Sequence, residues 1–207
     1  MVGDSRLGIS ARIIAETPRL LLTEWNKADV HDYAQLIGDE RVMRYIGNGE
    51  ARNISKAEAE INGFIAHEAE HGFSRWVVRE QSHGRFVGMV GFMVRDGEVD
   101  FGGRVNRAFW GSGYAPEALV YALKEGLAKR GIGRAIALTV EKNERAWKLN
   151  EKFGLKYENT LEISGVKHVK QSIDANKYWG ERVFEKGLSI LEPITKRDEL
   201  RKARLHE

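Results

Sequence analysis

The sequence predicts one α/β domain whose sheet is mostly antiparallel and is parallel only around its two middle strands. Three strand-like segments over 73–80, 85–94 and 98–106 follow one another, joined by short turns typical of hairpins. Between 99 and 127 a strand, a glycine turn and a helix start follow in order, because the apolar residues change from strand spacing to helix spacing. No internal repeat or low-complexity linker divides the 207 residues, which indicates a single domain.

Each remaining element has a local signal. A strand is expected over 19–25, directly after Pro18, and Asp29 is expected to cap a short helix. Ser55-Lys-Ala-Glu58 has the form of a capping box, which opens a helix that Gly72 closes. The elements predicted further along are a long helix from Ala115 to Gly131 or Gly133, a strand over 135–140, a helix over 143–153 and closing strands over 155–163 and roughly 178–184. The sheet would then have about six or seven strands flanked by helices.

Composition limits the possible classes of protein. We divide the chain into a loose leader over 1–16, a domain over 17–185 and an extension over 186–207, in which Thr195 caps a charged helix. The absence of cysteine excludes disulfides and cysteine zinc sites, and we expect no metal. A net charge of +3 is too small to argue for nucleic acid, and no apolar run could span a membrane. We therefore expect a cytoplasmic protein; the sequence does not distinguish a monomer from a homodimer.

The most informative stretch is the turn Trp110-Gly111-Ser112-Gly113-Tyr114-Ala115, which leads from a strand into a helix. Free backbone N–H groups at a helix start form an anion site when no Cβ stands in the way. Any tight turn of this kind favours glycine, so the turn alone leaves packing and anion binding both open. In the preceding strand, Gly102-Gly103 predicts either a bulge or a close backbone approach.

A second block, Thr139-Val-Glu-Lys-Asn143-Glu-Arg-Ala-Trp-Lys-Leu-Asn-Glu-Lys-Phe-Gly154-Leu155, spans the next strand and helix. Together the two blocks resemble the GNAT superfamily of acyl-CoA-dependent N-acetyltransferases. They look most like its RimJ/RimL-like branch, which includes enzymes that acetylate ribosomal-protein N-termini. Two earlier segments, Thr17-Pro-Arg-Leu-Leu-Leu22 and Asp39-Glu-Arg-Val-Met-Arg-Tyr45, also look like the first strand and helices of that branch. The resemblance covers about residues 17–158 and implies a single GNAT-like domain that transfers an acetyl group from acetyl-CoA to an amine.

The resemblance also implies which residues bind acetyl-CoA. The strand near Gly103 would pair with the pantetheine arm, and one N–H there would polarise the thioester carbonyl. Asn143 would reach the same arm, although a helix N-cap is an equally good interpretation. For Trp110 we favour packing over contact with the ligand. The complete cofactor-binding set is Val105 and Asn106 on the strand, Trp110, Gly111, Ser112, Gly113, Tyr114 and Ala115 around the pyrophosphate, and Asn143 and Lys152 on the second block.

The expected chemistry is attack of a neutral amine on the acetyl thioester, with CoA thiolate leaving. An alkyl amine is mostly protonated near neutrality, so a group should take its proton, directly or through water. Asp100 matches the carboxylate that the family carries on this strand, and Glu98 lies two residues earlier on the same face. The alternative for Asp100 is an ordinary exposed strand carboxylate.

The second block departs from the family pattern. Asn150 stands where many GNAT enzymes carry a tyrosine general acid, and Ala146 stands where the RimJ/RimL-like branch has serine. Asn150 could hydrogen-bond the sulfur, or Tyr157 or Tyr178 could approach from the closing strands. The missing hydroxyls leave a second hypothesis open, a non-catalytic acyl-CoA-binding module or sensor. A dinucleotide-binding protein is disfavoured, because no Gly-x-Gly-x-x-Gly lies early in a βαβ unit.

The fold class does not determine the acceptor, which could be a protein or peptide N-terminus or a small amine. Glu60, Glu68 and Glu70 lie on one of the early helices that form the acceptor cleft in this family, where they could favour a cationic acceptor. A solvated helix face explains these carboxylates equally well.

Overall fold

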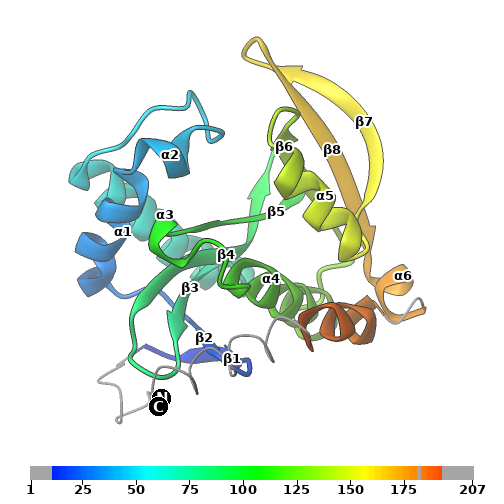
Figure 1. Cartoon of the computed structure of the whole chain (residues 1–207), viewed down its shortest axis with the longest axis horizontal. Helices are drawn as coiled ribbons and strands as arrows, with labels where there is room; N and C mark the ends of the chain where they lie inside the picture. The colour runs from blue at the N-terminus through cyan, green and yellow to red at the C-terminus, as the bar shows by residue number, and fades with distance from the viewer. Residues whose placement is uncertain (1–10, 181–182, 193–207) are drawn as a thin grey trace.

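The computed structural model describes residues 11–180 and 183–192. Within these residues the strands form one eight-stranded sheet in the order β1-β2-β3-β4-β5-β6-β8-β7 (Figure 1). All neighbouring strands are antiparallel except β5 and β6, which are parallel. The predicted mixed sheet with one parallel pair at its middle is therefore confirmed.

The N-terminal half of the sheet is a meander of antiparallel strands. It consists of β1 (Ile13–Glu16), β2 (Leu20–Thr23), β3 (Arg75–Glu80), β4 (Phe86–Arg95) and β5 (Glu98–Val105). The prediction that a loose leader extends to residue 16 is wrong, because 13–16 pair with β2 and Ile14 is buried in the core. Hydrogen bonds to β2 and burial of Ile14 explain why this short segment is ordered.

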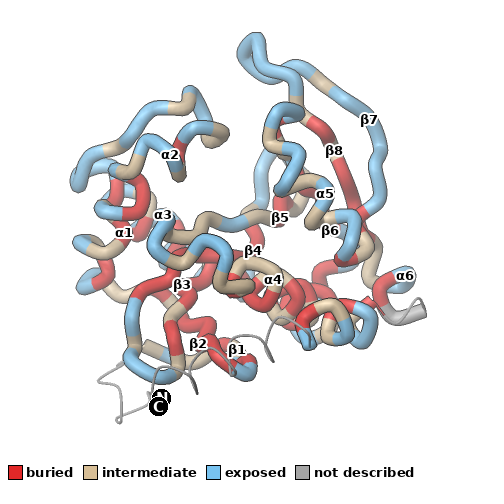
Figure 2. Tube along the Cα trace, in the orientation of Figure 1, coloured by how far each residue is buried: buried red, intermediate tan, exposed pale blue. Residues whose placement is uncertain are grey.

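Helices cover both faces of this sheet. η2 (Lys27–Asp29), α1 (Val30–Ile37), α2 (Glu40–Met43) and α3 (Ile54–His71) lie on one side, where α1 and α3 pack over Val77 and Met89. α4 (Tyr114–Lys124) crosses the other face over Trp76 and Phe92, and it continues into the π-helical turn η4 (Glu125–Lys129). Burial is concentrated in the central strands and in α4 (Figure 2). Alternate residues of each central strand thus contribute to two separate cores.

Two helix starts differ from the sequence prediction. Asn53, not Ser55, caps α3, because its side chain accepts the backbone N–H of Lys56 and the helix begins at Ile54. Asp29 makes no capping bond to α1; its carboxylate accepts the N–H of Asn26 and completes a capping box at η2. The predicted end of α3 is confirmed, since Gly72 adopts φ of +74° there.

The C-terminal half contains the second predicted block. It consists of β6 (Arg134–Val140), α5 (Glu144–Lys152), β7 (Lys156–Ile163), β8 (Val166–Asp174) and α6 (Ala175–Gly180). The closing strand predicted near 178–184 is wrong, because 166–174 form it and residues 183–192 are helical. Ser164 and Gly165 both have positive φ and make the two-residue hairpin turn between β7 and β8, a turn signal that the sequence analysis did not use.

β7 forms the outer edge of the sheet and is exposed along almost its whole length (Figure 2). The helix predicted after Thr195 lies outside the described residues. Among the described residues, no helix combines the length and hydropathy needed to cross a membrane.

Candidate functional site

β5 and β6 are paired at one position only, Asp100 with Ile136, and diverge beyond it. On its other side β5 stays bonded to β4, and the N–H of Asn106 donates to the carbonyl of Val87 at 2.8 Å. Bonding direction alternates along a strand, so the N–H groups of Gly103 and Val105 point the opposite way, towards β6. The divergence therefore leaves a short length of β5 backbone available to an extended ligand.

The turn after β5 presents a second set of backbone donors. Gly111 and Gly113 adopt φ of +82° and +81°, and α4 begins at the next residue. The Ser112 hydroxyl donates to the carbonyl of Phe109 at 2.6 Å and accepts the N–H of Tyr114 at 3.2 Å, which fixes the turn. In the described part of the chain, the N–H groups of Gly111, Gly113 and Ala115 have no hydrogen-bond partner. A Cβ added at Gly111 would meet no atom within 4 Å, so that position faces open space.

Asn106 and Trp110 both serve the local structure between β5 and the turn. The Asn106 side chain accepts the N–H of Ala108 at 3.0 Å and caps the short helix η3 (Arg107–Phe109). The half-exposed Trp110 donates its indole N–H to the carbonyl of Val105 at 2.9 Å. The Trp110 indole is thus bonded to the strand β5, which supports a packing role for this side chain.

The glycine pair in β5 marks a close approach rather than a bulge. The register of β4 and β5 is regular from Glu98 opposite Arg95 to Val105 opposite Gly88. A Cβ on Gly103 would lie 2.6 Å from the backbone oxygen of Met89, and one on Gly102 would lie 2.7 Å from the guanidinium of Arg75. Of the two predicted alternatives, the bulge is therefore wrong and the close approach is confirmed, since a side chain at either position would displace its neighbours.

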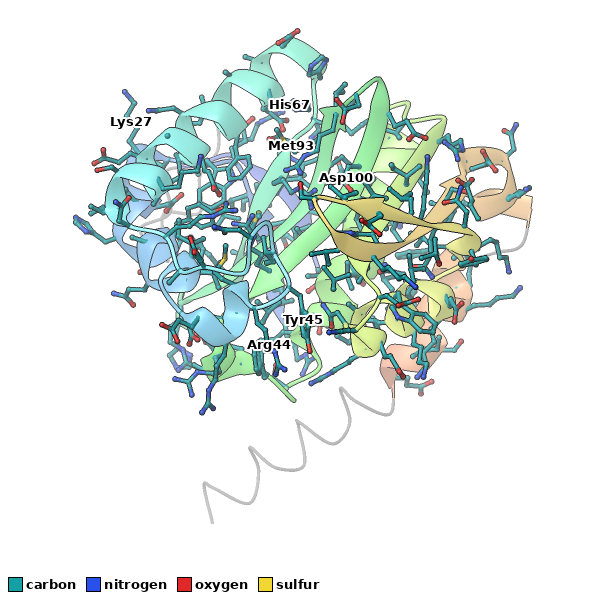
Figure 3. The ribbon with its side chains drawn as sticks, turned by 90° about the horizontal axis from the view of Figure 1, so that it is seen from above. Lys27, Arg44, Tyr45, His67, Met93 and Asp100 are labelled. Atoms are coloured by element: carbon teal, nitrogen blue, oxygen red, sulfur yellow. The ribbon has the colours of Figure 1, made fainter. Side chains whose placement is uncertain are left out.

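Asp100 is buried and paired with Arg75, so the exposed-carboxylate interpretation is wrong. The guanidinium of Arg75 donates to Asp100 Oδ2, and Arg95 Nε lies 3.9 Å from the same oxygen. Burial lowers the pKa of Arg75, and the charge of Asp100 opposes that effect. Within the described residues, Asp100 Oδ1 has no hydrogen-bond partner. Seen from above, Asp100 lies near the centre of the molecule (Figure 3).

Glu98 is the second predicted carboxylate, and both of its oxygens are occupied. Lys170 Nζ donates to Oε2 at 2.6 Å and Arg134 Nη1 donates to Oε1 at 3.0 Å. These hydrogen bonds, that of Lys170 first, lower the pKa of Glu98. Glu98 is therefore ionised near neutrality and links β5 to β6 and β8.

α5 brings the two predicted asparagines to the other side of the diverging strands. Asn143 is the N-cap residue of α5, as the N-cap interpretation predicts, but its side chain makes no capping hydrogen bond. Asn150 Nδ2 donates to Gln171 Oε1 at 3.1 Å, and Gln171 Nε2 donates to the carbonyl of Trp147 at 3.0 Å. Gln171 is fully buried, so Asn150 is held in place by a satisfied polar side chain of β8.

The other predicted side chains are not brought together with these groups. Tyr178 lies in α6 and is buried in the main core, where burial raises its pKa. Tyr157 is exposed on β7, with its hydroxyl 3.3 Å from Thr160 Oγ1. Lys152 is exposed in the last turn of α5. The expectation that Tyr178 approaches from a closing strand is wrong, because that segment is helical.

Two of the three α3 carboxylates that were predicted to favour a cationic acceptor are neutralised. Glu60 accepts the Tyr33 hydroxyl at 2.5 Å and bonds to the guanidinium groups of Arg52 and Arg104. Glu68 lies 3.2 Å from Arg130 and accepts the indole N–H of Trp76. The solvated-face interpretation is therefore wrong for these two residues. Glu70 alone of the three is exposed.

The family model of the acetyltransferase (GNAT) domain matches residues 19–156, which is more than half of the chain. The chain belongs to the GNAT acetyltransferase family. This match confirms the acetyltransferase family that the two sequence blocks predicted. Members of this family use acetyl-CoA.

Solved GNAT structures share the fold at low identity. A GNAT-family acetyltransferase from Bacillus anthracis superposes with a TM-score of 0.69 at 21% identity, over 78% of this chain and 98% of that chain. RimL, a ribosomal-protein α-N-acetyltransferase solved with coenzyme A, gives 0.68 at 13% identity, over 79% and 98%. RimJ of Mycobacterium smegmatis, solved with CoA-disulfide, gives 0.63 at 19% identity, over 76% and 83%.

Three residues that shape this GNAT site have no predicted role in the sequence analysis. Arg75 neutralises Asp100, while Arg19 and Glu117 form an ion pair beneath the glycine turn. Arg19 lies in the segment 17–22, which also looks like the RimJ/RimL-like branch, and Glu117 lies two residues after the glycine turn. Nothing in the sequence pairs Arg75 with Asp100, because they come together only through the register of β3, β4 and β5.

Proposed function

We propose that this protein transfers an acetyl group from acetyl-CoA to a primary amine, by direct attack in a ternary complex. The observation that carries the proposal is the pair of open donor sets: the turn at the start of α4 and the free edge of β5. Donors at a helix start suit a pyrophosphate, and donors on a strand edge suit an extended arm that ends in a carbonyl. Both sets fit one long ligand because they are a few residues apart in the chain.

Acetyl-CoA supplies the activated acetyl thioester. In this proposal the N–H groups of Gly111, Gly113 and Ala115 bind the pyrophosphate, and the N–H of Gly103 or Val105 donates to the thioester carbonyl. A donor aimed at that oxygen stabilises the negative charge that develops there during attack. The uncommitted side chain of Asn143 is available for the arm between these two points.

Asp100 is the proposed proton acceptor, because its Oδ1 is open whereas both oxygens of Glu98 are bonded. Protonated Asp100 would leave the buried guanidinium of Arg75 beside a neutral acid, which is costly. We therefore propose that Asp100 passes the proton on to water rather than retaining it. Glu98 keeps a structural role in linking the strands.

The departure of the thiol needs little help in this proposal. A thiol has a pKa near 8.5, so its thiolate is a fair leaving group without an acid. Ala146 offers no hydroxyl, and one amide hydrogen of Asn150 is committed to Gln171. The second amide hydrogen of Asn150 is the proposed donor to the sulfur.

The acceptor we propose has a single reacting amine, such as a peptide N-terminus or a small monoamine. A polyamine is disfavoured because Glu60 and Glu68, which would attract it, are already engaged by arginines. Attraction between an engaged carboxylate and a second cation is much weaker than for a free one.

Thiol release from acetyl-CoA, followed with a thiol reagent, tests the proposal. The panel contains peptides with free N-termini, the same peptides acetylated beforehand, small monoamines and spermidine. We expect release only with unblocked monoamines or peptides. If CoA binds in calorimetry and no amine raises thiol release above buffer, the chain is an acyl-CoA-binding module instead. If CoA does not bind, both the acetyltransferase and the acyl-CoA-binding hypotheses fail.

A further inference from the structure

A buried ion pair lies beneath the glycine turn. Arg19, between β1 and β2, donates from Nε to Glu117 Oε2 at 2.7 Å, and Glu117 belongs to the first turns of α4. Both side chains are almost completely buried, at 8% and 2% exposure. A buried charge pair of this kind is costly to form, so its contacts with the turn decide whether it has a role beyond packing.

Each oxygen of the Glu117 carboxylate is satisfied by the segment that leads into β2. Oε1 accepts the hydroxyl of Thr17 and the backbone N–H of Arg19, the latter at 2.9 Å, while Oε2 accepts the guanidinium. The Thr17 hydroxyl in turn accepts the N–H of Leu20 at 2.8 Å. This segment and the start of α4 are nearly one hundred residues apart in the chain, so the network fixes their relative position.

Arg19 also reaches the turn itself. Its Nη1 donates to the backbone carbonyl of Ser112 at 2.9 Å, and its guanidinium lies 4.7 Å from the centre of the Tyr114 ring. The Tyr114 hydroxyl donates to Glu80 at 2.7 Å on β3. Holding the Ser112 carbonyl on the protein side fixes the orientation of the peptide plane between Ser112 and Gly113, so that the N–H of Gly113 points the opposite way.

The charge of Glu117 bears on any anion bound at the turn. A buried carboxylate near the start of α4 opposes the positive end of the helix dipole, and it repels a phosphate. The guanidinium of Arg19 cancels that charge and leaves the N–H groups to act on the ligand. A planar guanidinium can serve Glu117 and Ser112 together, which an ammonium cannot do with the same geometry.

We propose that Arg19 and Glu117 are positioning residues for the CoA pyrophosphate. Together they hold the turn so that its N–H groups point outward. Arg19 also neutralises Glu117, which is the only charged residue in the first two turns of α4 as the structure describes them. This inference rests on the proposed function, because it presupposes that the turn binds pyrophosphate. Neither residue touches the acetyl group, so they affect ligand affinity and leave the chemical step alone.

The test compares two ligands, CoA and pantetheine, which lacks the pyrophosphate. The variants are Arg19→Lys, which keeps the charge but loses the fork, and Glu117→Gln, which keeps the shape but leaves the cation uncompensated. Asp29→Asn is the matched control, since Asp29 forms a comparably buried pair with Arg79 away from the turn. All four chains are measured by calorimetry, with thermal unfolding to establish the folded fraction.

We expect Arg19→Lys to raise the Kd for CoA about tenfold or more, while the Kd for pantetheine stays within about twofold. In steady state the KM for acetyl-CoA rises with little change in kcat, and activity with S-acetylpantetheine is unchanged. Glu117→Gln should be less stable, with the same selective loss in its folded fraction. Asp29→Asn should change stability only.

Four outcomes overturn the inference. Equal losses for CoA and pantetheine, or unchanged CoA affinity in folded Arg19→Lys, would make the pair purely structural. A selective loss in Asp29→Asn would show that any buried pair has this effect. If the unsubstituted protein binds no CoA, the proposed function itself fails, and that result is distinct from the other three.

Discussion

The residue Gly113 offers the sharpest test of the pyrophosphate site. It is the N-cap of α4 and has φ of +81°, a conformation that Asn and Asp tolerate better than other L residues. Both side chains are also good N-caps. Gly113→Asn and Gly113→Asp therefore form a matched pair with the same shape and the same helix start, and they differ by one negative charge.

The size of the effect follows from the geometry of the turn. A phosphate oxygen bound to the N–H of Gly113 lies about 2.9 Å from the nitrogen, and an aspartate carboxylate is roughly 3 Å from its own nitrogen. The two charges are then about 6 Å apart. With an effective dielectric constant of about 60, a doubly charged pyrophosphate is repelled by about 2 kcal/mol, and physiological salt reduces this to about 1 kcal/mol. Gly113→Asp should thus bind CoA about fivefold more weakly than Gly113→Asn.

Calorimetric titration of both variants with CoA, at low and at physiological salt, measures this difference. The ratio of the two Kd values should grow as salt is removed, and it should be close to one for pantetheine. Equal CoA affinities of the two folded variants at low salt would refute the placement of the pyrophosphate on this turn. A ratio that persists with pantetheine would refute the electrostatic explanation.

Three further predictions concern other groups. Asp100→Asn should lower kcat by about two to four orders of magnitude and destabilise the fold; adding Arg75→Met should restore stability but not activity, and recovery of activity in the double variant would exclude Asp100 as the proton acceptor. Asn150→Ala should cost about tenfold or less in kcat and about 1–3 kcal/mol in stability, because the Oε1 of Gln171 loses its donor; a thousandfold loss of kcat with CoA binding intact would make Asn150 a principal catalytic group. His67 Nδ1 bonds to the carbonyl of Phe73, its Nε2 accepts the N–H of Val94, and burial lowers its pKa. As the pH falls, the unfolded chain therefore binds a proton at His67 before the folded chain does. The free energy of unfolding should fall as the pH drops below about 6.5. Denaturant titrations from pH 8 to pH 5 should show a smaller fall for His67→Gln, and an identical fall would contradict this assignment.

Local patterns determined the elements and the family. The three hairpin strands and the helix ends at Gly72 and Gly154 follow from alternation and from glycine turns, which act over a few residues. The donor set at the start of α4 is equally local, because Gly111 and Gly113 stand next to the helix that they open. The sequence shows the resemblance to GNAT enzymes for the same reason, because each of the two blocks that carry the resemblance is a continuous stretch of chain.

Short-range signals failed where two of them competed. Asn53 and Ser55 both lie at the start of α3, and the sequence does not show which one the packed helix uses as its cap. Ser164-Gly165 is a local signal for the hairpin between β7 and β8, whereas the apolar residues near 178, where a strand was predicted, belong to a helix packed in the core. In both cases tertiary packing selected between local options of similar strength.

The charge partners were decided by the tertiary structure alone. Arg75 meets Asp100 across three strands, and Arg19 meets Glu117 because α4 packs against β2 on the face opposite α1 and α3. The sequence supplies these charges but not their pairing, because an ion pair depends on distance in space and strand register brings together residues far apart in the chain. The same register decides that Asp100 keeps one oxygen open while Glu98 keeps none, and that difference assigns their proposed roles.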